Sequence, residues 1–549
     1  MSRLSAASPG PASTPPGGVR VSGRRWRIGA VLVAGLSLVA ASLGPAGDTR
    51  GPEAPPSAGA PTVNLRQDNG VYSLDAALGG SALTVGAGLD SMAASAEGAR
   101  GTQRASVAAT STGKIRVGAR ERLTVIVNLK TAGGLSRANA IAKKHRASRT
   151  ASWPSLAVAV YALPAGASQA KANAFVKALR ASASVASAGV SGVISPQPSI
   201  VRRVTVARRP ANSVGAIATM ARSVQANKIS TGKGVTVGVA DEGIFDENPA
   251  VAGKVNTKLG ASCLAGGKLV SGSTQGRPTA ADAGHGTAVA NVIAGSASVG
   301  PSRGIAPGAK VASVRVVTAA GSIFAEASIC AQQWAIKHRL PVLNMSYGVD
   351  WAGTLVGGLW NPRNADQAAV ITAMKRSQAY AQKRGVLTVA AAGNDGADFS
   401  DKSSLEDAQT GQRLSKSMLG LPAELPGVVV ASMTQRNGKI DRWSTVGLGL
   451  VDLAAQGTAK LASGRTTFET VTGTSFASPA VAGTAALLKA KHPSWTPAKI
   501  AVRLRSSATH RTCAKAGTIV SRQPCRASKG RTSFFGSGTL NAEAALKAR

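Results

Sequence analysis

Hydrophobic and polar positions follow two different periods in the C-terminal part of the chain. Short apolar runs rich in β-branched residues are separated by longer stretches in which apolar residues recur every three or four positions. The short runs predict strands at 234–241, 309–317, 341–346, 385–394 and 427–433. The longer stretches predict helices, two of which are expected at 325–339 and 367–384. Because these strands are apolar on both faces, they indicate a parallel sheet covered by helices on both sides. An active site in such a sheet is expected at the carboxyl ends of the strands.

A smaller unit with the same mixture of periods precedes this region. Residues 114–200 predict the order strand, helix, strand, helix. The two strands are expected at 122–130 and 155–164, and the two helices at 136–147 and 169–182. The pattern indicates a separate small α+β domain.

Two segments show no sustained periodicity. Residues 48–113 are rich in Ala, Gly, Ser and Pro, and we expect a low-complexity linker there. Residues 201–211 contain the pairs Arg202–Arg203 and Arg208–Arg209, which predict an exposed connector. Such a connector is a natural place for proteolytic cleavage, whereas the alternative is that the arginines are only solvated.

The N-terminus predicts export. Arg24, Arg25 and Arg27 precede the uncharged run 28–47, which ends in small residues. This pattern is typical of a cleaved signal peptide within residues 1–47. The alternative is an uncleaved membrane anchor, because the run is about long enough to span a bilayer. We therefore expect a secreted or periplasmic protein that meets a membrane only through this segment before cleavage.

The chain of 549 residues is strongly basic, with a formal net charge of +39. The excess of positive charge is divided almost equally between residues 1–211 and 212–549. A surface of this kind attracts polyanions, acidic lipids or acidic proteins, so a polyanion-binding protein is one alternative. The sequence has no zinc-finger spacing and no basic helix leading into heptads, and we therefore predict no specific nucleic-acid partner.

The four cysteines allow three disulfide pairings in an oxidising compartment. Cys513 and Cys525 are the favoured pair because they are close in sequence, in a segment rich in turn and basic residues. Cys263 and Cys330 stay open to two interpretations, a disulfide or free buried thiols. The CxxC spacing typical of zinc sites is absent from the sequence.

One serine lies at the start of a predicted buried helix. The stretch GTSFASPAVAGTAALL (473–488) places Ser475 between a turn of small residues and an apolar run. The first turn of a helix carries unpaired backbone N–H groups and partial positive charge, which would stabilise an oxyanion. Ser475 is therefore a candidate nucleophile, and the alternative is that Thr474 or Ser475 only caps the helix.

Three further polar residues lie at strand ends or helix starts on the same side of the predicted sheet. Asp241 ends a strand in VADEG, His285 opens a helix in GHGTAVANVIAG, and Asn394 ends a strand in VAAAGND. Each has a structural alternative, since Asp and Asn are common in caps and turns and a lone histidine is often structural. With Ser475 they supply a base, an orienting carboxylate and an oxyanion donor, and this combination predicts catalysis.

Six segments, in the order VGVADEG, GHGTAVANVIAG, GIAPGAKVASVRV, VLNMSYG, AAAGND and GTSFASPAVAG, resemble the subtilases, the subtilisin-like serine proteases, over about residues 212–545. The resemblance implies a three-layer α/β domain with a mainly parallel sheet and a serine endopeptidase that forms an acyl-enzyme. It assigns Ser475 as the nucleophile, His285 as the general base and acid, and Asp241 as the residue that orients the imidazole. Asn394 and the Ser475 backbone N–H would bind the oxyanion.

The resemblance also implies how substrates and ions bind. Ser346, Tyr347 and Gly348 are similar to the strand along which the family's polypeptide substrates lie as an added edge strand. The loop at 349–367 would narrow the choice of substrate, or its two tryptophans only pack the loop. No cofactor is required for the chemistry. Structural calcium is an expectation of the family, and no local motif fixes its site here.

Residues 114–200 resemble the family's inhibitory propeptide, a small ferredoxin-like α+β unit that assists folding and covers the cleft before its removal. The domain order implied is signal peptide 1–47, linker 48–113, propeptide 114–200, processing linker 201–211 and peptidase domain 212–549, and we expect a monomeric zymogen. Because the propeptide and the peptidase domain are both basic, shape and backbone hydrogen bonds are expected to hold them together. The alternatives are a catalytically dead relative, and a dedicated processing protease in place of a general scavenger.

One residue departs from the family's pattern. The family usually has Ser or Thr after its aspartate, whereas this chain has Glu242. A second carboxylate near the imidazole predicts a raised pKa of His285 and an upward shift of the pH optimum.

Overall fold

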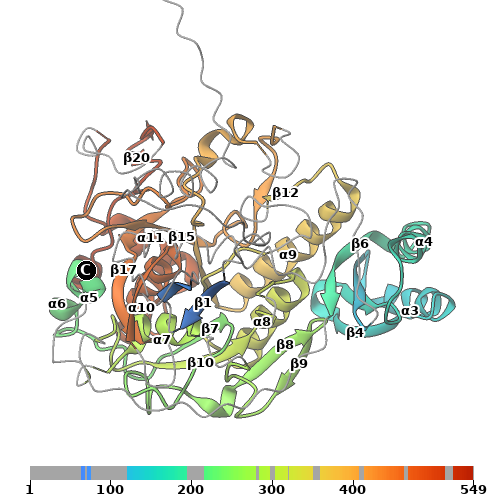
Figure 1. Ribbon diagram of the computed structural model, residues 1–549, viewed down its shortest axis with the longest axis horizontal. Coiled ribbons are helices and arrows are strands. Elements are labelled where there is room, and N and C mark those ends of the chain that lie inside the picture. Colours follow the sequence, from blue (N-terminus) through green and yellow to red (C-terminus); the bar gives the residue numbers. More distant parts are fainter. Residues whose placement is uncertain are drawn as a thin grey trace, which may run out of the picture. The chain divides into compact units, whose positions relative to one another are not determined.

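The computed structural model of the chain (Figure 1) describes most of the region after residue 119. The described residues are 64–68, 71–75, 120–194, 216–279, 284–296, 299, 303–318, 321–349, 359–406, 413–462, 468–513 and 523–547. The expected signal peptide at 1–47 and processing linker at 201–211 lie outside them. None of the helices in the described ranges has both the length and the apolar character that a membrane span requires.

The predicted linker at 48–113 contains a hairpin that we did not expect from the sequence. Strands β1 (Asn64–Asp68) and β2 (Val71–Asp75) pair in antiparallel register. The two residues between them in the sequence, Asn69 and Gly70, are the pair that two-residue hairpins favour. This local signal was available in the sequence.

The main sheet has eight strands in the order β16-β15-β13-β11-β7-β10-β8-β9. Their bounds are β7 Thr236–Asp241, β8 Ala261–Ala265, β9 Lys268–Ser271, β10 Lys310–Arg315, β11 Val342–Met345, β13 Leu387–Ala391, β15 Val429–Thr434 and β16 Leu453–Gln456. All neighbouring pairs are parallel except β8 with β9, which form an antiparallel edge. The five predicted strands are therefore confirmed, with β7 in the middle of the sheet.

Helices cover both faces of this sheet, as the apolar strands predicted. The covering helices are α7 (His285–Ala294), α8 (Ala325–Lys337), α9 (Ala365–Lys383), α10 (Thr474–Lys491) and α11 (Pro497–Ser506). Successive side chains of a strand point to opposite faces. On β7, Val239 accordingly joins the apolar cluster formed with α7, α10 and α11, whereas Ala240 joins the cluster formed with α8 and α9. The three-layer α/β fold is confirmed.

Smaller elements complete the C-terminal domain. They are α5 (Ala216–Met220), α6 (Ser223–Ala226), the pair β12 (Leu359–Trp360) and β14 (Leu419–Gly420), the pair β17 (Thr458–Ala462) and β18 (Phe468–Thr472), the pair β19 (Ala527–Ser528) and β20 (Arg531–Thr532), α12 (Ala542–Lys547), and the short 3-10 helices Thr257–Leu259 and Phe399–Ser404. The domain contains two disulfides among its described residues. Cys513 bonds to Cys525 as expected, and Cys263 on β8 bonds to Cys330 on α8, so these two cysteines are not free thiols.

The N-terminal unit, residues 120–194, is a four-stranded antiparallel sheet with two helices. Its elements are β3 (Arg122–Leu129), α3 (Leu135–Lys144), β4 (Ser148–Trp153), β5 (Val158–Ala162), α4 (Gln169–Arg180) and β6 (Val185–Ile194), with short 3-10 turns at Ala132–Gly134 and Pro154–Leu156. The strand order β4-β5-β3-β6 is ferredoxin-like. One face of the sheet and the two helices share a core of their own, which includes Val125, Tyr161, Phe175 and Leu179.

The other face of this small sheet packs on α8 and α9. Ile126, Val158 and Val160 belong to the same apolar cluster as Trp334 of α8 and Met374 of α9. The apolar core is thus continuous from the N-terminal unit into the C-terminal domain.

Polar contacts and close backbone approach add to this interface. The Asn128 side-chain amide donates to the carbonyl oxygen of Ala369 over 2.8 Å, and Arg180 forms an ion pair of 2.5 Å with Asp366. A Cβ atom on Gly189 of β6 would lie 2.5 Å from the Cα atom of Asp366, so that only glycine permits this approach. Hydrogen bonds and close packing thus add to the apolar contact between the two units, and Arg180 with Asp366 adds a pair of opposite charges.

Glu326 places a carboxyl group inside the same interface. It lies in the first turn of α8, is 2% exposed, and accepts a hydrogen bond of 2.6 Å from the Thr124 hydroxyl of β3. Its second oxygen, Oε2, is buried without a hydrogen-bond partner among the described residues. Burial raises the pKa of Glu326, and the hydrogen bonds from Thr124 and Ser191 oppose the rise. The N-terminal unit therefore contacts a carboxyl group whose pKa is raised by burial.

Candidate active site

The carboxyl end of β7 brings Asp241 to His285, the first residue of α7. Asp241 is 2% exposed, and its Oδ1 and Oδ2 atoms lie 2.9 Å and 3.1 Å from Nδ1 of His285. A carboxylate at this position fixes the tautomer in which Nδ1 carries the hydrogen and leaves Nε2 as an acceptor. The geometry is that of an orienting acid and a base.

Glycine allows the start of α7 to approach β7 closely. A Cβ atom on Gly286 would overlap the carbonyl oxygen of Gly243 and lie 3.1 Å from Oδ1 of Asp241. The hydroxyl of Thr287, one residue further along α7, accepts a hydrogen bond of 3.0 Å from the backbone N–H of Phe245. The GHGT sequence therefore docks the helix start against the segment that follows β7.

Ser475 lies in the first turn of α10, and its side chain is not a helix cap. The N-cap residue is Gly473, so neither Thr474 nor Ser475 is the N-cap residue of this helix. Ser475 is 8% exposed, and its hydroxyl donates weakly to the carbonyl oxygen of Ser346 over 3.3 Å. The ring of the next residue, Phe476, lies 5.4 Å from the His285 imidazole, between ring centroids. The capping interpretation is thus wrong, and the serine and the histidine lie in the same region.

Asn394 follows β13 and is held by the residue before the serine. Its Oδ1 accepts hydrogen bonds from the backbone N–H of Thr474 over 2.9 Å and from the Thr474 hydroxyl over 3.0 Å. Because Oδ1 is occupied in this way, the Nδ2 group is directed elsewhere as a donor. A Cβ atom on Gly473 would lie 3.4 Å from Nδ2, which places the amide beside the start of α10.

Ser346, Tyr347 and Gly348 follow β11 beside the candidate serine. The Ser346 hydroxyl donates to the carbonyl oxygen of Ser475 over 2.8 Å. Tyr347 points inward, is 9% exposed, and pairs with the Ser328 hydroxyl of α8 over 3.0 Å. Burial raises the pKa of Tyr347, so the phenol stays neutral. The backbone of this segment is therefore anchored on both sides.

The predicted loop at 349–367 is only partly described. Residues 350–358, with the first of its two tryptophans, lie outside the described ranges. Trp360 is fully buried and donates to the carbonyl oxygen of Val349 over 2.9 Å. For Trp360, the packing interpretation is confirmed.

Glu242 is tied to the histidine in a way that the sequence did not indicate. Its Oε1 accepts a hydrogen bond of 2.5 Å from the backbone N–H of His285, and its own backbone N–H donates to Oδ1 of Asp241 over 2.9 Å. Burial, and then the Asp241 charge, raise the pKa of Glu242 to about 7, whereas His285 lowers it. From the sequence we expected an effect on the imidazole, but not this backbone contact.

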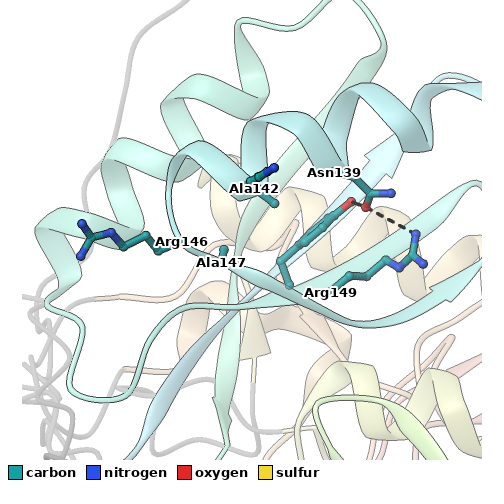
Figure 2. Close-up of a pocket in the computed structure, with 7 residues that line it drawn as sticks. Asn139, Ala142, Arg146, Ala147 and Arg149 are labelled. Carbon is teal, nitrogen blue, oxygen red and sulfur yellow. Dashed lines mark hydrogen bonds between the residues drawn. The ribbon is translucent and has the colours of Figure 1, made fainter.

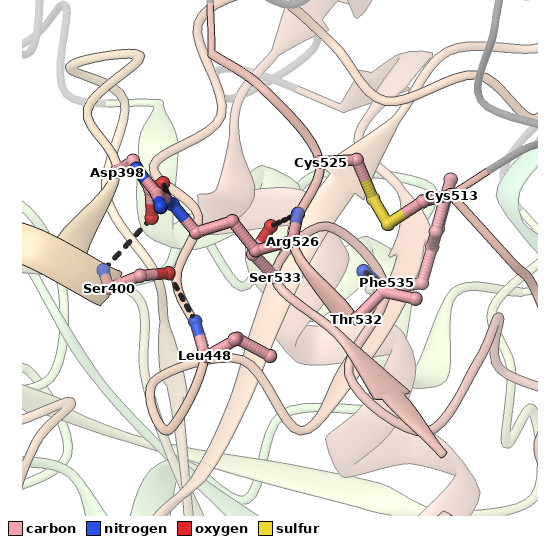
Figure 3. The surroundings of a disulfide bond; sticks show 9 residues. All are labelled: Asp398, Ser400, Leu448, Cys513, Cys525, Arg526, Thr532, Ser533 and Phe535. Carbon is pink, nitrogen blue, oxygen red and sulfur yellow. Dashed lines mark hydrogen bonds and ion pairs between the residues drawn. A yellow bond between two sulfur atoms is a disulfide. The ribbon is translucent and has the colours of Figure 1, made fainter. Parts of the chain in front are cut away.

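The loop that follows Asn394 is supported by the C-terminal segment, as Figure 3 shows beside the Cys513–Cys525 disulfide. Arg526, next to Cys525, donates to Oδ2 of Asp398 over 2.9 Å, and Asp398 also accepts from the backbone N–H of Ser400. Sequence analysis missed these supporting residues, because the partners are far apart in the chain and carry no local pattern.

The N-terminal unit has a hollow of its own, of about 490 Å³, shown in Figure 2. It is lined by Asn139, Ala142, Lys143, Arg146, Ala147, Arg149 and Tyr161. Asn139 accepts hydrogen bonds there from the Tyr161 hydroxyl over 2.8 Å and from Arg149 over 3.4 Å. None of the candidate catalytic residues lines this hollow.

The donor groups needed for a carboxylate-rich ion site do not come together in the described part of the chain. No three His, Cys, Asp or Glu side chains cluster there in a way that could hold a metal ion. The residues present thus do not identify a place for the calcium that the resemblance implies, and we route no step through it.

A parallel α/β sheet with an aspartate–histidine pair and a serine at the start of a buried helix is the arrangement of subtilisin-like serine peptidases. The model of the Subtilase family, Peptidase S8, matches residues 232–538. The chain therefore belongs to the subtilase family and is a serine endopeptidase that acts on polypeptides. Enzymes of this family need no cofactor for catalysis.

Individual relatives support this assignment. The chain is 30% identical to Subtilisin NAT from Bacillus subtilis subsp. natto over 321 residues, which is 58% of this chain and 67% of the relative. It is 31% identical to Subtilisin Savinase from Lederbergia lenta over 324 residues, which is 58% of this chain and 94% of that protein.

Solved structures show the same fold. The epidermin leader peptide processing serine protease (EpiP) from Staphylococcus aureus matches with a TM-score of 0.58 and 19% identity, over 78% of this chain and 98% of that one. Fervidolysin from Fervidobacterium pennivorans, a keratinolytic enzyme related to subtilisin, matches with a TM-score of 0.54 and 19% identity, over 81% of this chain and 64% of that one.

Proposed function

We propose that this chain is a secreted serine endopeptidase, made as a zymogen and matured by removal of its N-terminal unit. The observation that carries the proposal is the pairing of Asp241 with His285 at the end of β7, next to a buried helix whose first turn holds Ser475. Asn394, fixed by Thr474 beside that turn, supports a role in oxyanion binding.

The proposed reaction passes through an acyl-enzyme. The Ser475 hydroxyl oxygen attacks the scissile carbonyl carbon while Nε2 of His285 takes the hydroxyl proton. When the C–N bond breaks, His285 gives this proton to the leaving amine. A water molecule then attacks the acyl-enzyme, with His285 again acting first as base and then as acid, and Ser475 is regenerated. Asp241 holds the imidazole in place and stabilises its charged form.

The negative charge of the tetrahedral intermediate requires donors. The Asn394 side-chain amide and the backbone N–H of Ser475 are the proposed pair. Because Oδ1 of Asn394 is occupied by Thr474, the amide can donate from Nδ2 without rotating. The N-terminus of α10 adds partial positive charge at the same place.

Substrates are proposed to lie along Ser346, Tyr347 and Gly348 as an added edge strand. Such binding uses backbone hydrogen bonds and tolerates many sequences. The side chain of Tyr347 turns inward to Ser328, which leaves the backbone of this segment for the substrate. Broad specificity follows from this proposal.

The N-terminal unit is proposed to be the inhibitory propeptide, 114–200, with cleavage in the basic connector 201–211. Its ferredoxin-like fold and its packing on α8 and α9 support this role. We further propose a signal peptide at 1–47, a linker at 48–113, a peptidase domain at 212–549, export to the outside or the periplasm, and a monomeric enzyme.

Self-processing provides the test. The chain from residue 48 onward is expressed in wild-type form and as Ser475→Ala, and both are followed by intact-mass spectrometry and by casein hydrolysis. The proposal expects the wild type to lose roughly residues 48–210 and to digest casein, while Ser475→Ala stays full length and inert. Wild-type protein that is folded but full length and inert would refute self-maturation.

A further inference from the structure

The start of the helix that carries His285 lacks a capping group of its own. The N-cap residue of α7 is Gly284, which has no side chain that could cap the helix, and the first turn contains no acidic residue. The free N–H groups of a helix start favour an anion. Glu242 supplies one from the end of β7, since its Oε1 accepts from the backbone N–H of His285 over 2.5 Å and its carboxylate also bonds to the N–H of Gly286.

Two consecutive residues thus hold the same histidine at two points. Asp241 binds the ring at Nδ1, whereas Glu242 binds the backbone. The backbone N–H of Glu242 donates to Oδ1 of Asp241, which fixes the two carboxylates relative to each other. The imidazole is therefore positioned from both ends, and a shift of the helix start would move the ring away from Asp241.

We propose that Glu242 is a positioning residue for the proposed catalytic base, holding the start of α7 so that the His285 imidazole stays in place during proton transfer. This proposal rests on the proposed function. It differs from a plain helix cap because the two capped N–H groups belong to the catalytic residue itself and to its neighbour. A cap elsewhere would affect stability, whereas this one affects the turnover number, kcat.

Charge adds a second effect of the same contact. Among the residues that the structure describes, the titratable groups that interact with Glu242 are Asp241 of β7 and His285 of α7. Ionised Glu242 favours the imidazolium form of His285, and it also strengthens both hydrogen bonds from the helix start. Burial raises the pKa of Glu242 to about 7, so its protonation and that of His285 are expected to act together in the acid limb of the kcat profile.

Kinetics of three variants, each measured after removal of the N-terminal unit, test the positioning role. Wild type, Glu242→Ala and Glu242→Gln are compared for kcat and KM on a peptide substrate between pH 5 and 10. At pH 9, Glu242→Ala should lower kcat by about tenfold to a hundredfold with little change in KM, which is the scale of losing hydrogen bonds to a charged acceptor. Glu242→Gln keeps an acceptor oxygen and should stay within about threefold of wild type. Its acid limb should move to lower pH because the imidazole loses the adjacent charge.

A matched control and a spectroscopic readout separate this proposal from the proposed function. Glu247→Gln changes an exposed acid in the same segment and should leave kcat and the acid limb as in wild type. The pKa of His285 is measured by NMR in ¹⁵N-histidine-labelled Ser475→Ala protein, with His285→Gln to identify its signals. It should fall when Glu242→Gln is added, whether or not the wild type is an active peptidase.

Several outcomes would overturn the proposal. Unchanged kcat in Glu242→Ala removes the positioning role, and a change confined to KM would place Glu242 in substrate binding. Equal loss in the alanine and glutamine variants would show that the hydrogen bond to the helix start is not what matters. If Glu242→Ala does not fold, the glutamine variant decides, and an unchanged His285 titration together with an unchanged acid limb refutes the proposal.

Discussion

The packing of β6 against α9 gives a prediction that the substitution Gly189→Ala, which adds a single methyl group, can test. A Cβ atom on Gly189 would lie 2.5 Å from both the Cα atom and the carbonyl oxygen of Asp366, and 2.8 Å from its carbonyl carbon. These are backbone atoms of a helix start, so they cannot turn away as the end of a flexible side chain would. Gly189→Ala should therefore weaken the binding of the N-terminal unit to α9 without a change in the unit's own core.

The size of the effect follows from the cost of overpacking. Forcing one extra methyl group into a closely packed contact costs about 1–3 kcal/mol. Because each 1.4 kcal/mol is a factor of ten, the affinity of the N-terminal unit should fall roughly 5- to 140-fold. Replacing a strand glycine by alanine should slightly stabilise the isolated unit. A lower affinity together with an unchanged or higher stability of the unit therefore shows that the contact was lost and not the fold.

A dissociation assay measures this directly. A recognition site for an unrelated, sequence-specific protease is placed within residues 201–211 of the Ser475→Ala chain, which is cut after purification. Release of the N-terminal unit is then followed by surface plasmon resonance. Gly133→Ala is the matched control, because its Cβ atom would meet only the Thr131 hydroxyl at 3.7 Å, an ordinary contact. Release of Gly189→Ala at the rate of this control would refute the interface described above.

Two further predictions concern the candidate active site and the contact of the N-terminal unit with α8. Asn394→Ala should lower kcat by about 10²–10³ with little change in KM, the scale known for the oxyanion-hole asparagine of subtilisin, and stopped-flow or steady-state hydrolysis of a peptide substrate measures it; a loss below threefold would exclude Asn394 as an oxyanion donor. Docking of the N-terminal unit should be tightest at acid pH, because burial in the interface raises the pKa of Glu326 above the value it has when uncovered. Affinity should then fall by up to about tenfold per pH unit between those two pKa values and level off above them, whereas Glu326→Gln should remove this pH dependence. The dissociation assay at pH 5 and pH 9 measures it. The same change of affinity with pH in the unsubstituted protein and in Glu326→Gln would show that Glu326 is not its cause.

Much of the fold could be predicted because the main strands are buried on both faces. Runs such as 234–241 contain no competing polar pattern, and they are bounded by glycine and by helices of clear period. Strand β4 was missed because its SRTASW sequence is exposed or only partly buried, and β6 because alanine, serine and glycine dilute its apolar period. Strands β8 and β9 were missed because they form a short antiparallel edge, largely exposed on β9.

The positions of the candidate site residues could be predicted from the sequence, but the contacts that hold them could not. Asp241, His285 and Asn394 lie at ends of elements, and topology brings such ends together even when the residues are far apart in the chain. Contacts such as Glu242 with the His285 backbone, or Arg526 with Asp398, depend on loop geometry that no local period encodes. The same is true of Thr124 with Glu326, whose partners belong to different folding units.

The order of the elements along the chain determines when the proposed nucleophile is synthesised. Because a polypeptide is synthesised from its N-terminus, the small sheet, then α8, and then α9 emerge before α10. The surface that receives the N-terminal unit is therefore complete while Ser475 has still to be made. The N-terminal unit and the helices on which it packs are therefore synthesised before the residue that we propose as the nucleophile.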